Sequence, residues 1–393
     1  MKFIFICRGD PWETPAGTEI FVGNLAVELA KQGHEIDLVY EEKSTVGRSL
    51  LRIENLTKDG FRLLQIPYFR SFEFRKKCSK RCHDLLADPN IAAVIAFGAG
   101  TFSGDIFDRL RASKSKSKAL LVYYAMDSMV MEYARSKGAA RASGLLTRLK
   151  MWLWYRTLTR VDKASCIKSD LILASSKDTA AHLVSDYDIQ PSKIKLLYEG
   201  IPDDFADCID VVDPDVPTFL HVAGGPRKGT DLFLKAVRML EDNYGLKARA
   251  VIIRASQSDL ERSRVLDVDA KGYGYISTSE LKHLYGSCTA FVSPSLSEGF
   301  CLPIIEAAMF EKPLIVTNVG SLPELVTDGE NGFVIPVEDV NTLVDRMHQI
   351  AINTELRKKM GKNARKRAEN FTINNTSSKL LTIIKEFNID VLS

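Results

Sequence analysis

The chain of 393 residues is 45% hydrophobic and 26% charged, which is the balance of a folded globular protein and excludes a disordered or fibrous one. Its 53 Lys and Arg residues against 50 Asp and Glu residues leave a net charge of +3, so there is no overall positive field to indicate nucleic-acid binding. At roughly 100 to 200 residues per domain, the length predicts two domains.

The cysteines and the N-terminal run predict a cytoplasmic protein. The seven cysteines are scattered and odd in number, which is not the pattern of a secreted disulfide framework. The apolar run at residues 1–7 is broken at once by Arg8 and Asp10, so it is too short for a signal peptide. No segment reaches the roughly 18 consecutive apolar residues of a membrane span.

Short β-rich apolar runs alternate with helical stretches along the first half of the chain. Continuous apolar strands separated by helices are typical of a parallel sheet that is buried on both faces. We therefore expect a doubly wound α/β domain over residues 1–204. Its strands are expected at residues 3–7, 36–40, 92–97, 119–124, 171–174 and 195–198.

The stretch from residue 200 to 217 is rich in Pro and Asp and has little periodicity, which indicates a linker. The alternation then resumes and predicts a second doubly wound domain over residues 205–370. A ligand site is expected in a cleft between the two domains. Periodicity leaves open whether a final helix within residues 371–393 returns to the first domain. The strands of the second domain are expected at residues 218–222, 248–253, 290–293, 313–317 and 332–335.

The most informative segment, residues 293–307, follows one of these strands. A helix that begins near Pro303 would present the unpaired amides of residues 299–302 to an anion. Glu298 before this helix and Glu306 within it are suitable acceptors for sugar hydroxyls. The alternative is that Glu298 caps the helix and that Glu306 is solvated.

A second motif follows the strand expected at residues 218–222. Arg227 and Lys228 come after a turn formed by Gly224 and Gly225 and before another helix. Two adjacent cations at a strand-to-helix crossing could neutralise a pyrophosphate without a metal ion. An ordinary surface turn is the alternative interpretation.

Together these motifs resemble a known family. Glu298 and Glu306 with seven residues between them, the Arg-Lys-Gly run at 227–229 and the runs at 320–324 and 328–333 are similar to the retaining, nucleotide-sugar-dependent glycosyltransferases of the GT-B fold. This is the large family four class, also called glycosyl transferases group 1. The runs at 15–19 and 33–36 resemble its N-terminal signature. The resemblance implies an acceptor-binding and a donor-binding Rossmann-like domain, no metal and no cofactor.

The resemblance also implies roles for individual residues. Glu306 would bind the ribose hydroxyls, Glu298 the transferred sugar, and Arg227 and Lys228 the pyrophosphate of the donor. The remaining donor-binding positions that it implies are Gly17, Gly225, Tyr275, Ile276, Gly299, Phe300, Cys301 and Leu302. Of these, Tyr275 and Ile276 stand where the family holds the base through backbone groups.

One departure from the family concerns the reaction centre. Many members carry a His in the loop after the fourth strand of the first domain, where this chain has Asp127. We expect Asp127 to orient or polarise the reacting groups, with a helix N-cap as the alternative. The implied reaction is front-face transfer of a hexose with retention, in which Asp127, Glu298, Arg227 and Lys228 are catalytic and electrostatic stabilisation dominates. The run around Asp127 most resembles the glucosyltransferases of the lipopolysaccharide core.

Basic residues gather in two stretches of the first half, at residues 70–81 and 148–163. The second stretch interleaves them with Leu, Trp and Tyr, and a basic helix with aromatic residues can lie on an anionic bilayer. The alternative is a buried helix with a basic edge. We therefore expect a glycan, lipid-linked or anionic acceptor of cell-envelope or glycoconjugate synthesis, and peripheral contact with the inner face of the membrane.

Two other functions are compatible with the same fold. A nucleotide-sugar epimerase would use the donor, expected to be a UDP-sugar, without an acceptor. A catalytically silent relative would act only as a binding or assembly subunit. The presence of Glu298, Glu306, Arg227 and Lys228 argues against a silent protein, whereas the missing histidine at the loop leaves it open.

Overall fold

The computed structural model describes residues 1–7, 17–43, 49–57, 60–69, 90–98, 103–112, 119–131, 133, 145–207 and 212–392. These residues form two compact units. The first unit contains the described parts of Met1–Ala134 and Ser143–Gly200, together with Ile373–Ser393. The second unit is formed by Ile201–Thr372. Each unit has its own sheet, so we describe them in turn.

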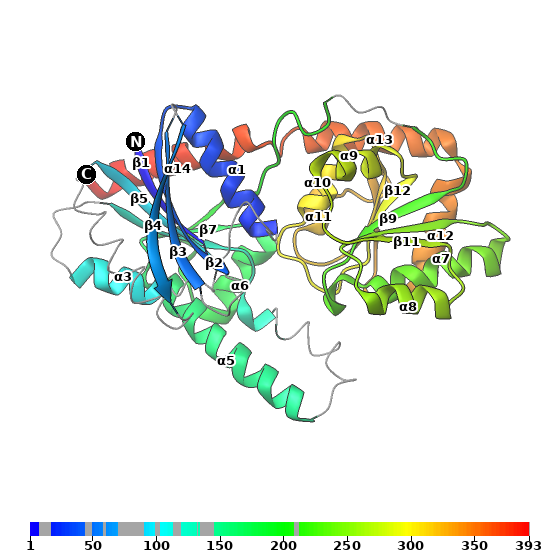
Figure 1. Ribbon diagram of the computed structural model, residues 1–393, viewed down its shortest axis with the longest axis horizontal. Helices are drawn as coiled ribbons and strands as arrows, with labels where there is room; N and C mark the ends of the chain where they lie inside the picture. The colour runs from blue at the N-terminus through cyan, green and yellow to red at the C-terminus, as the bar shows by residue number, and fades with distance from the viewer. Residues whose placement is uncertain are drawn as a thin grey trace. The chain divides into compact units, whose positions relative to one another are not determined.

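An eight-stranded sheet organises the first unit, with the strand order β4-β3-β2-β1-β5-β6-β7-β8 (Figure 1). The pairs among β1, β2 and β5 to β8 are parallel, whereas β3 and β4 are antiparallel additions at the edge beyond β2. The strand bounds are β1 Lys2–Ile6, β2 Glu35–Lys43, β3 Ser49–Thr57, β4 Gly60–Phe69, β5 Ile91–Phe97, β6 Leu120–Ala125, β7 Leu171–Ala174 and β8 Ile194–Leu196.

The six parallel strands lie where the apolar runs predict them, although β8 begins and ends earlier than expected. The sequence does not predict β3 and β4, because both mix charged or amide side chains with apolar ones. Antiparallel strands can leave one face to water, so they need no continuous apolar run. The first sheet is therefore parallel with an antiparallel edge, rather than purely parallel.

Five α-helices are described around this sheet, and the last comes from the C-terminal part of the chain. Gln32 Nε2 donates to Asn374 Oδ1 at 3.1 Å and to Ser377 Oγ at 2.8 Å, and Thr376 Oγ1 donates to the Tyr198 carbonyl at 3.1 Å. The C-terminal helix thus packs within the first unit, beside the end of α1. The helix bounds are α1 Gly17–Lys31, α3 Ser103–Ala112, α5 Leu145–Lys168, α6 Lys177–Tyr187 and α14 Ile373–Leu392.

The second unit has a six-stranded, fully parallel sheet with the order β11-β10-β9-β12-β13-β14. Numbered within the unit, this is the order 3-2-1-4-5-6 of the Rossmann fold. Five of these strands were expected, whereas β11 carries Lys and Gly in a run too short and polar to stand out. The strand bounds are β9 Thr218–Val222, β10 Arg249–Ile253, β11 Ala270–Tyr273, β12 Ala290–Ser293, β13 Leu314–Thr317 and β14 Gly332–Ile335.

Helices flank both faces of the second sheet (Figure 1). Helix α7 contacts α8 and α12, and α10 contacts α9 and α13. In the described ranges, every helix of either unit is too short or too polar to cross a lipid bilayer. The helix bounds are η4 Pro226–Lys228, α7 Thr230–Tyr244, α8 Gln257–Val265, α9 Thr278–Gly286, α10 Leu302–Met309, α11 Leu322–Leu325, α12 Val340–Ile352 and α13 Thr354–Ala368.

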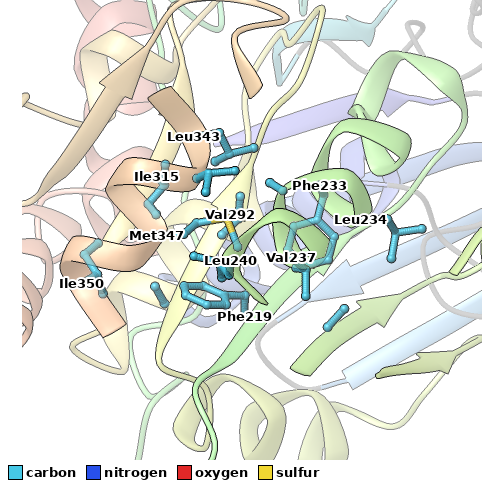
Figure 2. Close-up of a cluster of buried hydrophobic side chains, with 14 of the residues drawn as sticks. Phe219, Phe233, Leu234, Val237, Leu240, Val292, Ile315, Leu343, Met347 and Ile350 are labelled. Atoms are coloured by element: carbon cyan, nitrogen blue, oxygen red, sulfur yellow. The ribbon is translucent and has the colours of Figure 1, made fainter. Parts of the chain in front are cut away.

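The core of the second unit lies between its sheet and the pair α7 and α12. Phe233, Val237 and Leu240 recur at helical spacing along α7, and all three are buried. Figure 2 shows them beside Met347 and Ile350 of α12, with side chains of β9, β12 and β13 in the same cluster. This packing fixes β9 and β12, whose carboxyl ends carry the two main motifs of the sequence.

Candidate active site

The loops that follow β9, β12 and β13 meet at the carboxyl edge of the second sheet. The amide of Leu296, after β12, donates to the carbonyl of Arg227, after β9, at 2.7 Å. Thr317 Oγ1, at the end of β13, donates to the Ser295 carbonyl at 2.6 Å. Ligands bind at this edge in open parallel α/β sheets, particularly where the strand order reverses, as it does between β9 and β12.

A buried ion pair lies at the centre of these loops. Lys228 Nζ is 2.5 Å from Glu298 Oε2, and Arg227 Nη1 is 3.9 Å from Glu298 Oε1. Ser295 Oγ also donates to Glu298 Oε2, at 3.2 Å. Glu298 is only 3% exposed, so its charge depends on these partners for stabilisation. The structure thus brings together three of the four predicted catalytic residues.

Two alternatives from the sequence are wrong. Helix α10 has Cys301 at its N-cap and no side-chain hydrogen bond to the cap, so Glu298 does not cap the helix. The turn with Arg227 and Lys228 is not an ordinary surface turn either, because Lys228 is largely buried and paired with a buried carboxylate. Only Arg227 remains substantially exposed.

Two glycines allow the backbone to close around Glu298. A Cβ atom on Gly229 would lie 2.1 Å from the Pro294 carbonyl oxygen, and one on Gly320 would lie 1.7 Å from that of Glu298. Both glycines also have positive φ, at 73° and 54°. The runs at 227–229 and 320–324 therefore share one physical role: the glycine of each allows close backbone contact with the loop that carries Glu298.

The residues at 299–302 form the entry to α10, as predicted. The amide of Ile304 donates to the Cys301 carbonyl at 3.0 Å, but Cys301 provides no side-chain cap for the other amides at this positive helix end. Burial, and then the nearby Glu298 charge, raises the pKa of the Cys301 thiol to about 12, so it stays a neutral thiol. The Phe300 ring lies 6.2 Å from that of Phe371. Gly299 and Leu302 flank this entry.

Glu306 belongs to a second group on α10. Tyr285 of α9 donates its hydroxyl to Glu306 Oε2 at 2.7 Å. Burial raises the pKa of Glu306, while this hydrogen bond and the charge of Arg254 act in the opposite direction. The prediction that Glu306 is merely solvated is therefore wrong. Glu298 and Glu306 each have their own hydrogen-bond partners.

Arg254 connects Glu306 to the predicted base-binding turn. It directly follows β10 and lies in the left-handed region, with φ of 57°, and its guanidinium lies 5.5 Å from the centre of the Tyr275 ring. Tyr275 is 72% exposed, and Ile276 beside it is half-buried. Sequence reasoning missed Arg254 and Tyr285. A charged residue at the carboxyl end of a predicted strand was the available signal for Arg254.

A buried histidine connects the elements that carry the loops of the site. His221 Nδ1 lies 3.0 Å from the Val292 carbonyl oxygen and Nε2 lies 3.1 Å from Thr230 Oγ1, so the ring bridges β9, β12 and the start of α7. Its ring stacks on Phe233 with centroids 5.0 Å apart. Burial lowers the pKa of His221 to about 4 and keeps it neutral. No sequence pattern indicates a role for this histidine.

Of the remaining predicted residues, Gly225 precedes η4 in the second unit with φ of 86°, whereas Gly17 and Asp127 lie in the first unit. Gly17 begins α1, with open space where a Cβ would stand. Thr18 Oγ1 donates to Met126 Sδ at 2.6 Å, which places the start of α1 beside the loop of Asp127. Asp127 is buried and its Oδ1 accepts the Ser128 amide at 2.8 Å. The helical turn at residues 129–131 is capped by Ser128, whose Oγ accepts the Met131 amide at 3.1 Å.

Some predictions cannot be placed. Residues 15 and 16, which begin the N-terminal signature, and the basic stretch at 70–81 lie outside the described residues. The cleft predicted between the domains stays a prediction. Within the described ranges, no three His, Cys, Asp or Glu side chains gather as a metal site would require. Metal-independent chemistry stays a prediction as well.

Two family models match the sequence in succession and cover most of it. Glycosyltransferase Family 4 matches residues 15–205, and Glycosyl transferases group 1 matches residues 212–367. The chain belongs to the glycosyltransferases, and its two parallel-sheet units have the GT-B fold of that family.

Individual relatives agree with this assignment. The D-inositol 3-phosphate glycosyltransferase of Saccharomonospora viridis is 27% identical over 275 residues, which is 64% of this chain and 62% of the relative. The first curated relatives are matched over only 41% to 62% of their own length.

Solved structures extend the likeness to the whole fold. Sucrose-phosphate synthase from Thermosynechococcus elongatus has a TM-score of 0.77 at 19% identity, over 99% of both chains. Anabaena HepE in complex with UDP-glucose has a TM-score of 0.66 at 15% identity, over 97% of this chain and 99% of that one. At such identities the likeness shows the fold alone.

Proposed function

We propose that this protein is a metal-independent, retaining glycosyltransferase that moves a hexose from a nucleotide-diphosphate sugar to an acceptor. The observation that carries the proposal is the buried Lys228–Glu298 pair, with Arg227 beside it, at the uncapped start of α10. Two cations and a positive helix end form a site for a diphosphate, and the buried carboxylate next to them is an acceptor for sugar hydroxyls.

In the proposed reaction, these groups act mainly on the leaving diphosphate. Lys228 and Arg227 would turn from Glu298 to the phosphate oxygens, and the amides at the start of α10 would share the charge. Glu298, released from Lys228, would accept hydrogen bonds from the transferred sugar. Glu306, held by Tyr285, would accept the ribose hydroxyls, and the Arg254–Tyr275 surface would adjoin the base. We propose Asp127 as the orienting group on the acceptor side.

A UDP-sugar is the donor that we propose, because the similar fold of Anabaena HepE is seen with UDP-glucose. Thermal-shift measurements with UDP-, GDP- and ADP-sugars test the proposal directly. A ligand at 100 times its dissociation constant stabilises a protein by about 2.7 kcal/mol, so the correct donor raises the melting temperature. No shift with any of these sugars would refute the donor site.

A matched pair of variants localises the effect. Arg227→Gln should weaken the donor-induced shift, whereas Arg249→Gln should not. The two arginine side chains are similarly exposed, at 42% and 46%, and each faces a carboxylate. Arg249 begins β10 and therefore lies at the opposite edge of the parallel sheet. An equal loss of the donor-induced thermal shift in both variants would show a general charge effect rather than a diphosphate site.

Product analysis separates the alternatives. A transferase releases the nucleoside diphosphate together with a glycoside of the same anomeric configuration as the donor, which NMR identifies. An epimerase would interconvert donor sugars in the absence of any acceptor. A silent subunit would bind a nucleotide sugar and turn over none. Inversion of the anomeric centre would contradict the retaining mechanism.

The acceptor that we propose is a glycan, lipid-linked or anionic molecule of cell-envelope or glycoconjugate synthesis, reached from the inner face of the membrane. Helix α5 of the first unit supports this proposal. Trp154 and Trp152 are exposed large apolar residues, and the one acidic residue of the helix, Asp162, is fully buried. An outward stripe at helical spacing is formed by Leu149, Leu153, Arg156, Arg160, Lys163 and Ile167.

This arrangement favours the membrane interpretation of the sequence over a buried helix with a basic edge. Exposed Leu and Trp next to exposed Arg and Lys suit the interface of an anionic bilayer. Flotation with anionic and neutral liposomes tests it. The protein should float with anionic vesicles, and Leu149→Ser with Leu153→Ser should reduce the floating fraction. Equal flotation with neutral vesicles, or none with either, would refute this part of the proposal.

A further inference from the structure

The inward face of α5 carries a carboxylate that the proposed reaction does not use. Asp162 is fully buried in the first unit. Its Oδ1 accepts the hydroxyl of Tyr123 on β6, and its Oδ2 accepts that of Tyr187 on α6 at 2.6 Å. Oδ2 also lies 3.3 Å from the amide of Met129. One buried carboxylate therefore joins a strand, two helices and the turn two residues after Asp127.

The other polar contacts of this loop act on the same backbone. The Met129 amide also donates to Tyr187 Oη at 3.0 Å. On the other side of Asp127, the Met126 carbonyl accepts hydroxyls from Ser175 at 2.8 Å and Thr179 at 3.0 Å. The loop is thus held by hydrogen bonds both before and after Asp127.

The hydroxyl of Ser128, the residue after Asp127, is also held by a hydrogen bond. Ser128 Oγ donates to Asp186 Oδ2 at 2.5 Å, one residue before Tyr187 in α6. The Ser128 amide in turn donates to Asp127 Oδ1. The end of α6 therefore contacts both residues that follow Asp127, which fixes the direction of this short turn.

We propose that Asp162, together with Tyr123 and Tyr187, is a positioning residue that holds the loop of Asp127 in its working geometry. This inference rests on the proposed glycosyltransferase function, because Asp127 is its proposed acceptor-side group. A reacting group must be held within about 0.5 Å of its productive position, and buried hydrogen-bond networks supply such rigidity. The Asp162 network would therefore affect turnover while leaving the donor site of the second unit intact.

Both tyrosine hydroxyls of this network donate their hydrogen bonds to Asp162. Burial and the Asp162 charge raise the pKa of both tyrosine hydroxyls well above the ordinary value, so both remain donors. Hydrogen bonds to a charged acceptor are roughly twice as strong as neutral ones. The carboxylate, rather than a neutral side chain of the same shape, is thus the element that keeps Tyr187 and Met129 in place.

Neighbouring tyrosines on β6 give a matched test. Tyr123 and Tyr124 are both fully buried, and each makes one described hydrogen bond through its hydroxyl. The Tyr123 bond goes to Asp162, whereas the Tyr124 bond goes to the Leu197 carbonyl at 3.1 Å and does not reach the loop. Tyr123→Phe and Tyr124→Phe therefore remove the same group from the same strand, with and without the proposed positioning effect.

The measurements use the full chain and the nucleotide sugar that gives the largest thermal shift. Release of its nucleoside diphosphate, with water as the acceptor, gives kcat and the donor KM. Hydrogen exchange of residues 126–131 follows the loop. We expect Tyr123→Phe and Asp162→Asn to lower kcat at least tenfold, leave the donor KM within twofold and speed loop exchange. Tyr124→Phe should keep kcat within twofold despite a similar loss of stability.

The outcomes that overturn each proposal differ. Equal loss of kcat in Tyr123→Phe and Tyr124→Phe would mean that the network acts only through stability, which overturns the positioning role. Unchanged loop exchange in Asp162→Asn overturns it as well, whether or not the protein is active. Absence of any turnover by the wild-type protein overturns the proposed function instead, and leaves loop exchange to decide the role of Asp162.

Discussion

Substitution of Lys228 by Met is the sharpest test of the site, because it leaves a buried carboxylate without its main partner. Glu298 would keep the Ser295 hydroxyl at 3.2 Å and Arg227 at 3.9 Å. Breaking a buried ion pair typically costs about 3 to 5 kcal/mol. Since Arg227 is exposed and screened, but still near, we expect the lower end, about 3 kcal/mol of the free energy of unfolding of the second unit.

A second substitution should restore most of this loss. Glu298→Gln alone leaves Lys228 without its carboxylate, but the partly accessible ammonium can be solvated. The free energy of unfolding should therefore fall by about 1 to 2 kcal/mol. With both changes no charge is left buried, and stability should return to within about 1 kcal/mol of the wild type. The pairwise coupling energy is then at least about 3 kcal/mol.

The assay must report on the second unit. All three tryptophans of the sequence precede residue 200, so Trp fluorescence follows the first unit. Amide hydrogen exchange of β12, which is fully buried, follows the second. A loss of about 3 kcal/mol corresponds to roughly a hundredfold faster exchange where global opening dominates. Unchanged exchange in Lys228→Met, or a double variant less stable than Lys228→Met, would refute the role given to this pair.

Three further predictions concern the surroundings of the site. Gly320→Ala should cost at least about 2 kcal/mol in denaturant unfolding, since its Cβ would meet the Glu298 carbonyl, whereas Gly274→Ala, with open space around it, should be nearly neutral. With a pKa near 12, Cys301 should resist iodoacetamide at pH 8 until the protein is unfolded, and mass spectrometry of labelled native protein would show otherwise. His221 has a pKa near 4 in the folded protein and 6.5 in the unfolded chain, so its contribution to the free energy of unfolding should be complete above pH 6.5 and fall by roughly 2 to 3 kcal/mol toward pH 4. His221→Phe should flatten this dependence of stability on pH, and an unchanged dependence would contradict the prediction.

The sequence by itself determined the parallel strands of both units other than β11, and the ends of the strands that carry the site. Parallel strands are buried on both faces, so their continuous apolar runs are visible without knowledge of their neighbours. Lys228, Glu298 and Glu306 could be selected for the same reason, since each follows such a run within a motif of the family. The antiparallel strands β3 and β4 and the short β11 were missed because their residues carry no such run.

Only the tertiary structure decided which of these residues contact one another. Lys228 and Glu298 are separated by 70 positions, and neither local propensity nor periodicity specifies their pairing. The same holds for Gly320 against the Glu298 backbone and for α14 beside α1. Apolar side chains are spread around α5, so its sequence did not show which face is buried. The hydrogen bonds of Asp162 to Tyr123 and Tyr187 determine the buried face, and the Trp and Leu residues then point outward. Contacts of this kind depend on neighbours distant in sequence, which exist only once the chain has folded.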